Sequence, residues 1–352
     1  MNRCPRIEVD IKKIEHNTKV LVDLCENIQI AGVTKVFCGH EEIAKAIVRG
    51  GVNFLADARI ENLKKLENIN IPKILLRLPM NSQVKEVVTY SDISLNSEIK
   101  TIKNLSKEAI KQNKKHKIIL MIDLGDLREG IWGDPIDTIK EIKDLEGIEI
   151  IGVGTNLTCY GGVIPSEENL GRLIKIREEI EERFNISLSI LSGGNSSSLY
   201  LIEKGRMPSK INHLRLGEAI VLGRETAYGD KIENTYEDAF TFVAEIIELK
   251  EKPSVPIGEI GMDAFGNKPI FEDNGIRKRA ILAVGRQDVQ TENIIPIDEN
   301  MKILGASSDH LILDITDAKD KYEAGDEVRF KLSYGGILQL MTSSYINKII
   351  QL

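Results

Sequence analysis

The sequence predicts a (β/α)8 barrel followed by a smaller, mostly β domain. Short β-branched, apolar runs alternate with amphipathic helical stretches eight times over about 220 residues. Eight is the number of parallel strands that closes such a barrel, which typically takes about 250 residues. After about residue 230, strand patterns follow one another without long helices between them. An open, doubly wound sheet is the weaker alternative, because no GxGxxG fingerprint follows the first strand.

The barrel elements follow from hydrophobic periodicity and helix-start signals. We expect strands at Ile28–Val33, Val52–Ala56, Lys73–Arg77, Asp92–Asn96, Lys117–Asp123, Glu149–Gly154, Leu188–Leu191 and His213–Leu216. We expect helices at Ile11–Cys25, Glu41–Val48, Ile60–Leu66, Gln83–Val88, Ser97–Asn113, Pro135–Lys143, Glu167–Phe184 and Ser198–Lys204. Asp134-Pro135 and Ser166-Glu167 are typical of helix starts, because a capping side chain precedes a residue suited to the first turn.

The rest of the chain predicts antiparallel β structure. We expect strands at Phe240–Leu249, Arg279–Val284, His310–Ile315, Glu327–Leu332 and Leu338–Met341. Gly-Asp and Tyr-Gly-Gly sequences between them are typical of turns. We therefore divide the chain into a barrel over residues 10–230 and a β domain over residues 231–352. The first strand, within residues 1–9, is expected to join the β domain.

Composition argues against several classes of function. The 352 residues include 47 Lys and Arg against 54 Asp and Glu, a net charge of -7, so neither nucleic acid nor an anionic membrane is an expected partner. No apolar run predicts a membrane span, and the first residues lack the apolar core of a secretory signal. Four scattered cysteines without CxxC predict neither disulfides nor a metal site, and they favour a cytoplasmic location.

Polar residues follow the predicted barrel strands, at the end where barrel active sites lie. They are Lys35, Asp57, Arg59, Arg77, Asn96, Asp123, Arg128, Asn156, Cys159, Tyr160, the run Ser192–Ser196, and Arg215 to Gly217.

Lys35 follows the first strand, which is strongly apolar, and has two interpretations. One interpretation is a surface lysine at a strand end. The other is a desolvated amine that forms a Schiff base.

Two segments near the end of the barrel predict a phosphate site. SGGNSSSL, from Ser192 to Leu199, combines glycines for close backbone approach with hydroxyls at a helix start, although an ordinary capping loop has the same composition. Leu216-Gly217-Glu218 offers further N–H groups. Phosphate held by the last two loops is the usual barrel arrangement. Together with Lys35, it suggests pyridoxal phosphate as the cofactor.

These residues resemble the fold-type III pyridoxal-phosphate enzymes, the alanine racemase superfamily, over nearly the whole chain. RIEVDIKKIEHNTKVL is similar to the first strand and helix of that superfamily, TKVFCGH to its lysine motif, and MIDLGDLREGI to its Asp–Gly–Arg–Gly strand end. SGGNSSS and LRLGEAIVLG resemble its phosphate loops and the arginine at the pyridine nitrogen. Within the superfamily the resemblance is greatest to the ornithine racemase group. It implies a racemase that interconverts L- and D-ornithine.

The resemblance assigns roles to individual residues. Lys35 would form the Schiff base with the cofactor, and Arg128 would face the substrate carboxylate or the cofactor hydroxyl, unless it only pairs with Asp123. Arg215 would face the pyridine nitrogen. The phosphate would be held by Asn195, Ser196, Gly217 and Glu218, with Tyr345 returning to it from the C-terminal segment.

The sequence also departs from alanine racemase. The position of the tyrosine base holds Arg286, a lysine near the motif aspartate is replaced by Met121, and Asn156 stands in place of a histidine. The second proton carrier is therefore open among Ser308, Cys159, Tyr160 and a relay through Arg286. Acidic residues are gained at Asp288 and Asp309, beside Ser308. Such carboxylates would select a diamino acid, unless they are ordinary turn residues in water.

Several alternatives stay open at this stage. A head-to-tail homodimer, implied by the resemblance, would bring these loops to the barrel of the partner, so that active sites lie at the subunit interface. A basic amino-acid decarboxylase of the same superfamily would also use the acidic pair, but Arg215 stands where those enzymes have a glutamate. A non-catalytic cofactor carrier would lack the β domain. Lysine and ornithine differ by one methylene, worth about 1–3 kcal/mol in binding.

Overall fold

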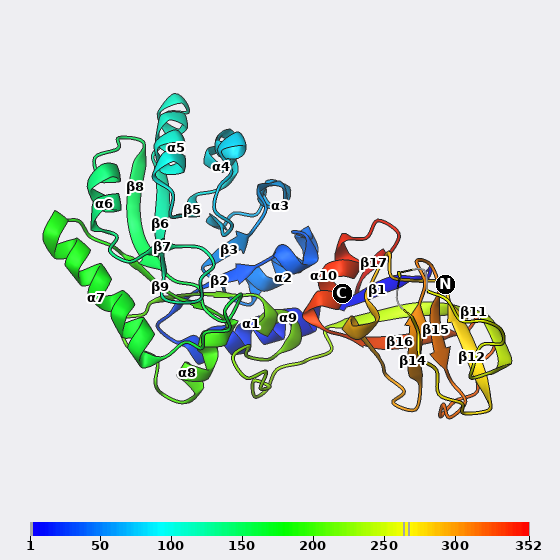
Figure 1. Cartoon of the computed structure of the whole chain (residues 1–352). Coiled ribbons are helices and arrows are strands. Elements are labelled where there is room, and N and C mark those ends of the chain that lie inside the picture. Colours follow the sequence, from blue (N-terminus) through cyan, green and yellow to red (C-terminus); the bar gives the residue numbers. More distant parts are fainter. Residues whose placement is uncertain (1–2, 263–264, 267, 352) are drawn as a thin grey trace. The chain divides into compact units, whose positions relative to one another are not determined.

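The computed structural model describes residues 3–262, 265–266 and 268–351. The chain divides into two compact units (Figure 1). One unit holds residues 11–237, so that residues 231–237 belong with the barrel. The other holds the described residues before Ile11 and after Glu237.

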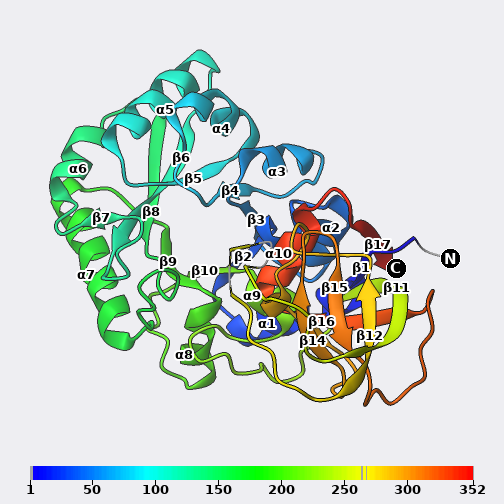
Figure 2. The same ribbon diagram turned by 45° about the vertical axis from the view of Figure 1, so that its right-hand side comes forward.

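The larger unit is a closed barrel of eight parallel strands, which confirms the predicted fold class (Figure 2). Its strands are β2 (Gln29–Val33), β3 (Phe54–Asp57), β4 (Lys73–Leu75), β5 (Ile93–Asn96), β6 (His116–Asp123), β8 (Ile148–Gly154), β9 (Ile190–Asn195) and β10 (His213–Leu216). The pairing of β5 with β6 and that of β2 with β10 close the ring. A short strand, β7 (Ile131–Trp132), pairs with the end of β6.

Helices cover the outside of the ring, as Figure 2 shows. They are α1 (Ile11–Cys25), α2 (Glu41–Arg49), α3 (Ile60–Lys65), α4 (Val84–Tyr90), α5 (Ile99–Lys111), α6 (Ile136–Ile142), α7 (Glu167–Phe184), α8 (Leu199–Glu203) and α9 (Glu218–Leu222). Single 3-10 turns are η1 (Lys35–Phe37), η2 (Asn81–Gln83) and η3 (Ser196–Ser198). Ser166 begins α7 with a capping box, in which its hydroxyl accepts from the Asn169 N–H group.

Two apolar layers stabilise the barrel. The inner layer fills the ring with residues such as Val33, Ile74 and Ile119. The outer layer packs the other face of the strands against the helices, with Leu120, Leu105 and Leu173 among its members. Because both strand faces are buried, the strands read as continuous apolar runs rather than alternating ones.

The smaller unit is built on one antiparallel sheet in the order β13-β16-β11-β12-β15-β14. Its elements are β11 (Phe240–Pro253), β12 (Ile276–Leu282), η4 (Thr291–Asn293), β13 (Ile294–Pro296), β14 (Lys302–Ala306), β15 (Leu311–Asp314), β16 (Glu327–Leu332), α10 (Tyr334–Thr342) and β17 (Asn347–Gln351). The first strand, β1 (Arg6–Asp10), pairs antiparallel with β11 and parallel with β17.

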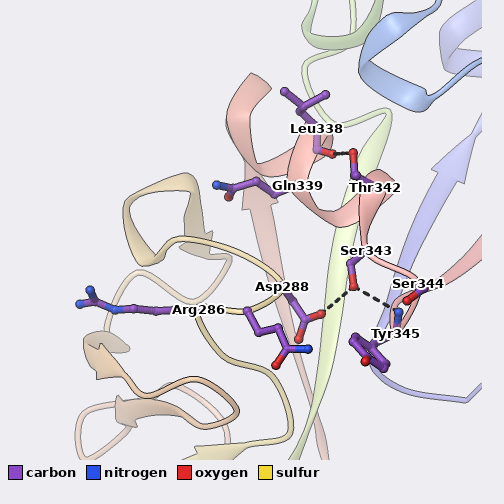
Figure 3. A pocket seen from close by; sticks show the side chains of 9 residues that line it. Arg286, Asp288, Leu338, Gln339, Thr342, Ser343, Ser344 and Tyr345 are labelled. Atoms are coloured by element: carbon purple, nitrogen blue, oxygen red, sulfur yellow. Dashed lines mark hydrogen bonds between the residues drawn. The ribbon is translucent and has the colours of Figure 1, made fainter. Parts of the chain in front are cut away.

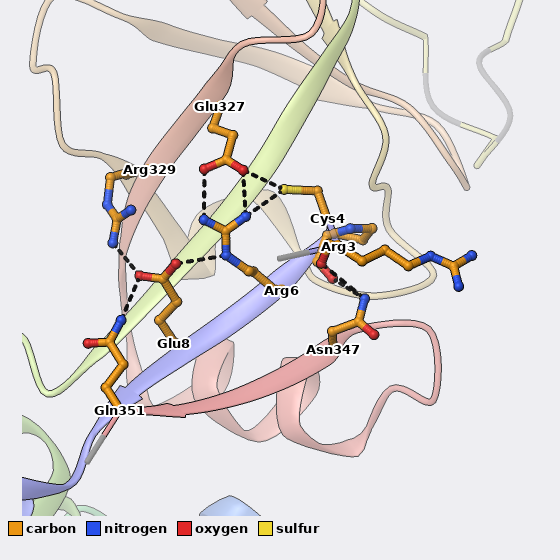
Figure 4. Close-up of polar contacts among 9 residues, drawn as sticks. Arg3, Cys4, Arg6, Glu8, Glu327, Arg329, Asn347 and Gln351 are labelled. Carbon is orange, nitrogen blue, oxygen red and sulfur yellow. Dashed lines mark hydrogen bonds and ion pairs between the residues drawn. The ribbon is translucent and has the colours of Figure 1, made fainter. Parts of the chain in front are cut away.

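A buried ion network lies where β1 meets its neighbours (Figure 4). Arg6 donates from Nε to Glu8 at 2.7 Å and forms two hydrogen bonds with the Glu327 carboxylate, at 2.6 and 2.7 Å. Glu8 also accepts from Arg329 and from Gln351. The network therefore connects β1 to β16 and to the last strand.

The prediction of a strand at Leu338–Met341 was wrong, since this segment is part of α10. We took Tyr334-Gly335-Gly336 for a turn, but Ser333 caps a helix there by accepting from the Gly336 N–H group at 3.1 Å. A short apolar run does not distinguish helix from strand by its period. The strands β13, β14 and β17 were not predicted.

Candidate functional site

The turn after β2 carries Lys35 at the carboxyl end of the barrel. Lys35 begins η1, and the next two residues, Val36 and Phe37, are fully buried and anchor the turn. The Lys35 side chain itself is exposed. The expectation of a desolvated lysine is therefore not met within the single chain.

The loops after β9 and β10 meet at Ser196. Its hydroxyl oxygen accepts from the N–H groups of Gly217 at 3.4 Å and Ala219 at 3.2 Å. Asn195 donates to the Leu157 carbonyl at 2.9 Å and accepts from the Ser197 N–H group at 2.8 Å. The structure thus brings Asn195, Ser196 and Gly217 together, with Glu218 next to them in an ion pair with Arg224.

Close backbone approach requires glycine in both loops. A Cβ atom on Gly193 would lie 2.5 Å from an Ile211 carbon, and one on Gly194, at a φ of +117°, would lie 2.7 Å from the Ser198 hydroxyl. A Cβ atom on Gly217 would lie 3.2 Å from Val33. These contacts leave room for main chain only.

Arg215 lies inside the barrel at the end of β10 and is almost fully buried. It donates to the Thr155 carbonyl at 2.8 Å, to Asn156 Oδ1 at 3.3 Å and to the Ser192 hydroxyl. No carboxylate among the residues that the structure describes forms an ion pair with it. Burial lowers the pKa of the Arg215 guanidinium to about 10.

Ser192 connects Arg215 to His213 on the same strand. His213 Nδ1 lies 2.8 Å from the Ser192 hydroxyl, and burial together with the charge of Arg215 lowers the pKa of His213 to about 3. Because a guanidinium only donates, the Ser192 oxygen accepts from it and its own hydrogen points to the neutral imidazole. The tautomer is inferred from this pattern.

Several buried polar atoms of the barrel interior have no hydrogen-bond partner. Among the described side chains they include Thr155 Oγ1, Asn156 Nδ2, Ser197 Oγ and His213 Nε2. Buried polar groups are nearly always paired, so a group of unpaired ones beside Arg215 is typical of a site for a polar ligand.

Asp123 ends β6 and Arg128 lies in the loop after it, but the two side chains do not pair with each other. Asp123 accepts from the N–H groups of Gly125 at 2.9 Å and Leu127 at 3.2 Å. The exposed Arg128 instead forms a two-pronged ion pair with Glu129. Sequence reasoning missed Glu129, although its place directly after the arginine was a signal.

A pocket of about 480 Å³ in the β unit collects residues predicted from that part of the chain (Figure 3). It is lined by Arg286, Asp288 and Tyr345, together with polar residues of α10 and the segment after it. Asp288 accepts from the Ser343 hydroxyl at 2.6 Å, and Tyr345 is exposed. Arg286 lies over the Phe265 ring, 4.5 Å from its centre.

The turn with Ser308 and Asp309 lies beside the turn with Arg286. The N–H groups of Arg286 and Gln287 donate to the carbonyls of Ser307 at 2.9 Å and Ser308 at 3.1 Å. Ser308 donates to Asp309 at 2.6 Å, and both side chains are exposed. The predicted residues of this unit thus form one group, and those of the barrel form another.

Comparison with known proteins decides the family. The family model described as "Alanine racemase, N-terminal domain" matches residues 9–225. The chain is 52% identical to the ornithine racemase of Acetoanaerobium sticklandii, over 98% of this chain and 99% of that protein. It is 42% identical to the lysine racemase of Thermotoga maritima, over 98% of both chains.

The chain belongs to the alanine racemase family. Solved alanine racemases share its fold: that of Clostridium difficile 630 aligns with a TM-score of 0.77 at 18% identity, covering 100% of this chain and 97% of that one. The alanine racemase of Bartonella henselae, solved with covalently bound pyridoxal phosphate, aligns with a TM-score of 0.75 at 17% identity, covering 98% and 99%.

Further residues contact the predicted ones in this member of the alanine racemase family. Ser192, which sequence reasoning placed only in the phosphate segment, accepts from Arg215 and lies next to His213, and the Thr155 carbonyl also accepts from Arg215. Asp57, which sequence reasoning placed at the barrel rim without a role, is fully buried next to Thr34. Its position at a strand end beside the lysine strand was the signal.

Proposed function

We propose that this chain is a pyridoxal-phosphate-dependent amino-acid racemase whose substrate is ornithine. The observation that carries the proposal is the 52% identity to an ornithine racemase over nearly the full length of both chains. The 42% identity to a lysine racemase supports a basic amino acid as the substrate class. A decarboxylase is disfavoured because both relatives are racemases.

The residues of the barrel fit the proposed cofactor. Its phosphate would be held by Asn195, Ser196 and the main chain of Gly217 and Glu218, which the loops after β9 and β10 bring together. The unpaired polar atoms of Thr155 and Asn156 lie next to Arg215, at the interior end of the same group. Tyr345 is retained as a proposed further phosphate contact.

Bound pyridoxal phosphate withdraws electrons from the α-carbon of an amino acid and so makes its α-hydrogen acidic. Arg215 would donate a hydrogen bond toward the ring nitrogen. Because a guanidinium cannot accept a proton and is held here by three partners, it would keep that nitrogen unprotonated. This would limit side reactions that need a stronger electron sink.

Racemisation requires a proton carrier on each face of the substrate. Lys35 is proposed for one face: its Nζ, in the neutral form, removes the α-proton and returns it in the reverse reaction. For the other face the candidates remain Cys159, Tyr160, Ser308 and a relay through Arg286. Cys159 and Tyr160 are exposed, and Asp126 fixes their turn by accepting from the Tyr160 N–H group at 3.0 Å.

Substrate selection is proposed to depend on charge. Asp288 and Asp309 would attract the distal ammonium group, and Arg128 would bind the carboxylate with its planar fork. We further propose a homodimer in which these acidic loops complete the site of the partner, as well as a cytoplasmic location on the sequence grounds given above. Among the described residues, no helix is long and apolar enough to span a membrane.

The test is incubation of the purified protein with a panel of L- and D-amino acids, followed by circular dichroism. We expect the signal of either ornithine enantiomer to decay to zero as both forms reach equal amounts. Lys35→Ala should lose both the cofactor absorbance and racemisation. Lys103→Ala, which removes an exposed lysine paired with Glu141, should keep both.

Carbon dioxide release in place of racemisation would instead identify a decarboxylase. Cofactor binding without turnover of any amino acid would identify a carrier. Full activity of Lys35→Ala would refute the role of that lysine.

A further inference from the structure

The turn that presents Lys35 is fixed by its neighbour on the next strand. Thr34, directly before the lysine, donates from its N–H group to the Ala56 carbonyl at 2.8 Å. Its hydroxyl donates to Asp57 Oδ2 at 2.6 Å. Both contacts join the end of β2 to the end of β3, so the main chain before Lys35 is held at two points.

The far side of the same turn is tied to the same carboxylate. Asn62 on α3 donates to Asp57 Oδ1 at 3.1 Å and accepts from Lys65 at 3.2 Å. Lys65 also donates to the Cys38 carbonyl, which closes the turn, at 2.9 Å. A Cβ atom on Gly39 would lie 2.9 Å from Asn62, so turn and helix are in close contact. The hydrogen bonds therefore run from Thr34 through Asp57 to Cys38 and enclose Lys35.

Three donors converge on the Asp57 carboxyl. The Arg59 N–H group donates to Oδ1 at 2.8 Å and the NH2 group of Asn62 donates to the same oxygen, while the Thr34 hydroxyl donates to Oδ2. Burial raises the pKa of the Asp57 carboxyl, and these hydrogen bonds oppose that rise. One buried side chain thus joins both sides of the turn.

Other charged or titratable side chains surround this turn from the packed elements. They are Arg59 and Lys65 beside and on α3, and His40, Glu41 and Glu42 at the start of α2. None of them donates a side-chain hydrogen bond to Asp57 among the contacts of the described residues.

We propose that Asp57 is the positioning residue of Lys35: its carboxylate holds the turn that presents the lysine, on one side through the Thr34 hydroxyl and on the other through Asn62. The inference rests on the proposed role of Lys35. It assigns to Asp57 no contact with substrate or cofactor. It explains how the turn that carries an exposed lysine at the barrel rim is held in one place.

The carboxylate is tested on the protein without cofactor, by hydrogen exchange and mass spectrometry of the peptide that holds residues 34–39. Asp57→Asn keeps the size, but only one of its two polar atoms can accept, so one side of the turn loses its hydrogen bonds. We expect the amides of the turn to exchange at least about threefold faster. Asp92→Asn, which removes a carboxylate at the opposite end of the barrel, should leave their exchange unchanged.

The turn is tested with the matched pair Thr34→Val and Thr34→Ser. Thr34→Val loses the hydrogen bond to Asp57. We expect the absorbance band that forms after addition of pyridoxal phosphate to appear at least threefold more slowly in this variant. Thr34→Ser keeps the hydroxyl and should load at the wild-type rate.

Unchanged exchange of the turn amides in a folded Asp57→Asn protein would overturn the proposal. If that variant shows no cooperative melting transition, the two Thr34 variants decide: equal rates of cofactor loading in both variants and in wild type would overturn the proposal. Absence of cofactor binding by the wild-type protein would count against the proposed function and leave the hydrogen-exchange result to stand by itself.

Discussion

Arg215 places a cation inside the barrel without an ion pair to a carboxylate among the described residues. Carbonyl, amide and hydroxyl oxygens bind it instead. Burying a charge without an ion pair costs free energy of folding, so we expect Arg215 to add little to stability. The neutral His213 below it, connected through Ser192, adds no opposing charge.

The variant Arg215→Met separates the contribution of Arg215 to activity from its contribution to stability. The variant should lose racemase activity, whereas the free energy of unfolding of the cofactor-free protein should stay within about 1 kcal/mol of wild type or rise. Urea denaturation followed by circular dichroism measures the change. A loss of more than about 3 kcal/mol would show instead that the guanidinium is a net stabilising group.

Glu8 on β1 is the centre of the ion network in Figure 4. Burial raises the pKa of Glu8, but the hydrogen bonds and charges of Arg6 and Arg329 outweigh it and lower the pKa below its ordinary value of 4.5. A carboxyl with a lowered pKa stabilises the fold above its unfolded-state pKa, and the contribution is lost as the pH falls through the folded-state value.

Glu8→Gln should therefore reduce the free energy of unfolding at pH 7 by about 3 kcal/mol, because Arg6 stays buried with one anion fewer. The difference from wild type should shrink when unfolding is measured below pH 4.5. Glu327→Gln is the control: its side chain is 39% exposed, and a smaller loss is expected. Equal losses at pH 7 and at pH 4 would contradict the assignment to Glu8 ionisation.

Gly152 in β8 shows how closely the barrel strands pack. A Cβ atom there would lie 2.2 Å from the Ile190 carbonyl oxygen and 2.8 Å from the Ile190 Cβ. Gly152→Ala should lower the free energy of unfolding by about 2 kcal/mol, because main chain has to move. Gly171→Ala in α7 meets nothing within 4 Å and should raise it by roughly 0.5–1 kcal/mol. Thermal melting of both variants checks the opposite signs.

At the scale of the whole molecule, the proposed dimer makes a prediction about mixtures. If Lys35 of one protomer and Asp288 of its partner serve the same site, Lys35→Ala and Asp288→Ala proteins are each impaired but complementary. After unfolding and refolding together they should recover about a quarter of wild-type activity, since half of the dimers are mixed and each has one intact site. Mixed dimers, verified by mass spectrometry, that stay inactive would argue against shared sites.

The barrel was predictable because its signals are local. Buried parallel strands are short apolar runs in the sequence. The start of a helix such as α7 is indicated by its capping residue, Ser166. The strands β14 and β17 gave no such signal, because Lys302–Ala306 is largely half-exposed and Asn347–Gln351 mixes polar with apolar residues. Their pairing with β15 and β1 depends on contacts distant in sequence.

The candidate site was predictable in part for a similar reason. Lys35, Asn195 and Arg215 belong to recognisable segments at strand ends, where barrel chemistry is expected. Thr34, Ser192 and Asp57 contact other side chains of the site. A sequence does not reveal that two buried groups at the ends of neighbouring strands, such as Thr34 and Asp57, are 2.6 Å apart. To predict such a contact, one has to know which residues of the two strands lie side by side, and only the structure gives this register.

The pairing of β1 with β17 has a consequence for synthesis on the ribosome. Arg6–Asp10 leave the ribosome before the barrel, yet their parallel neighbour Asn347–Gln351 is translated after it. The barrel segments can associate while translation continues, whereas β1 waits for β17. We expect nascent chains that stop before residue 347 to hold a protease-resistant barrel beside an unfinished β sheet.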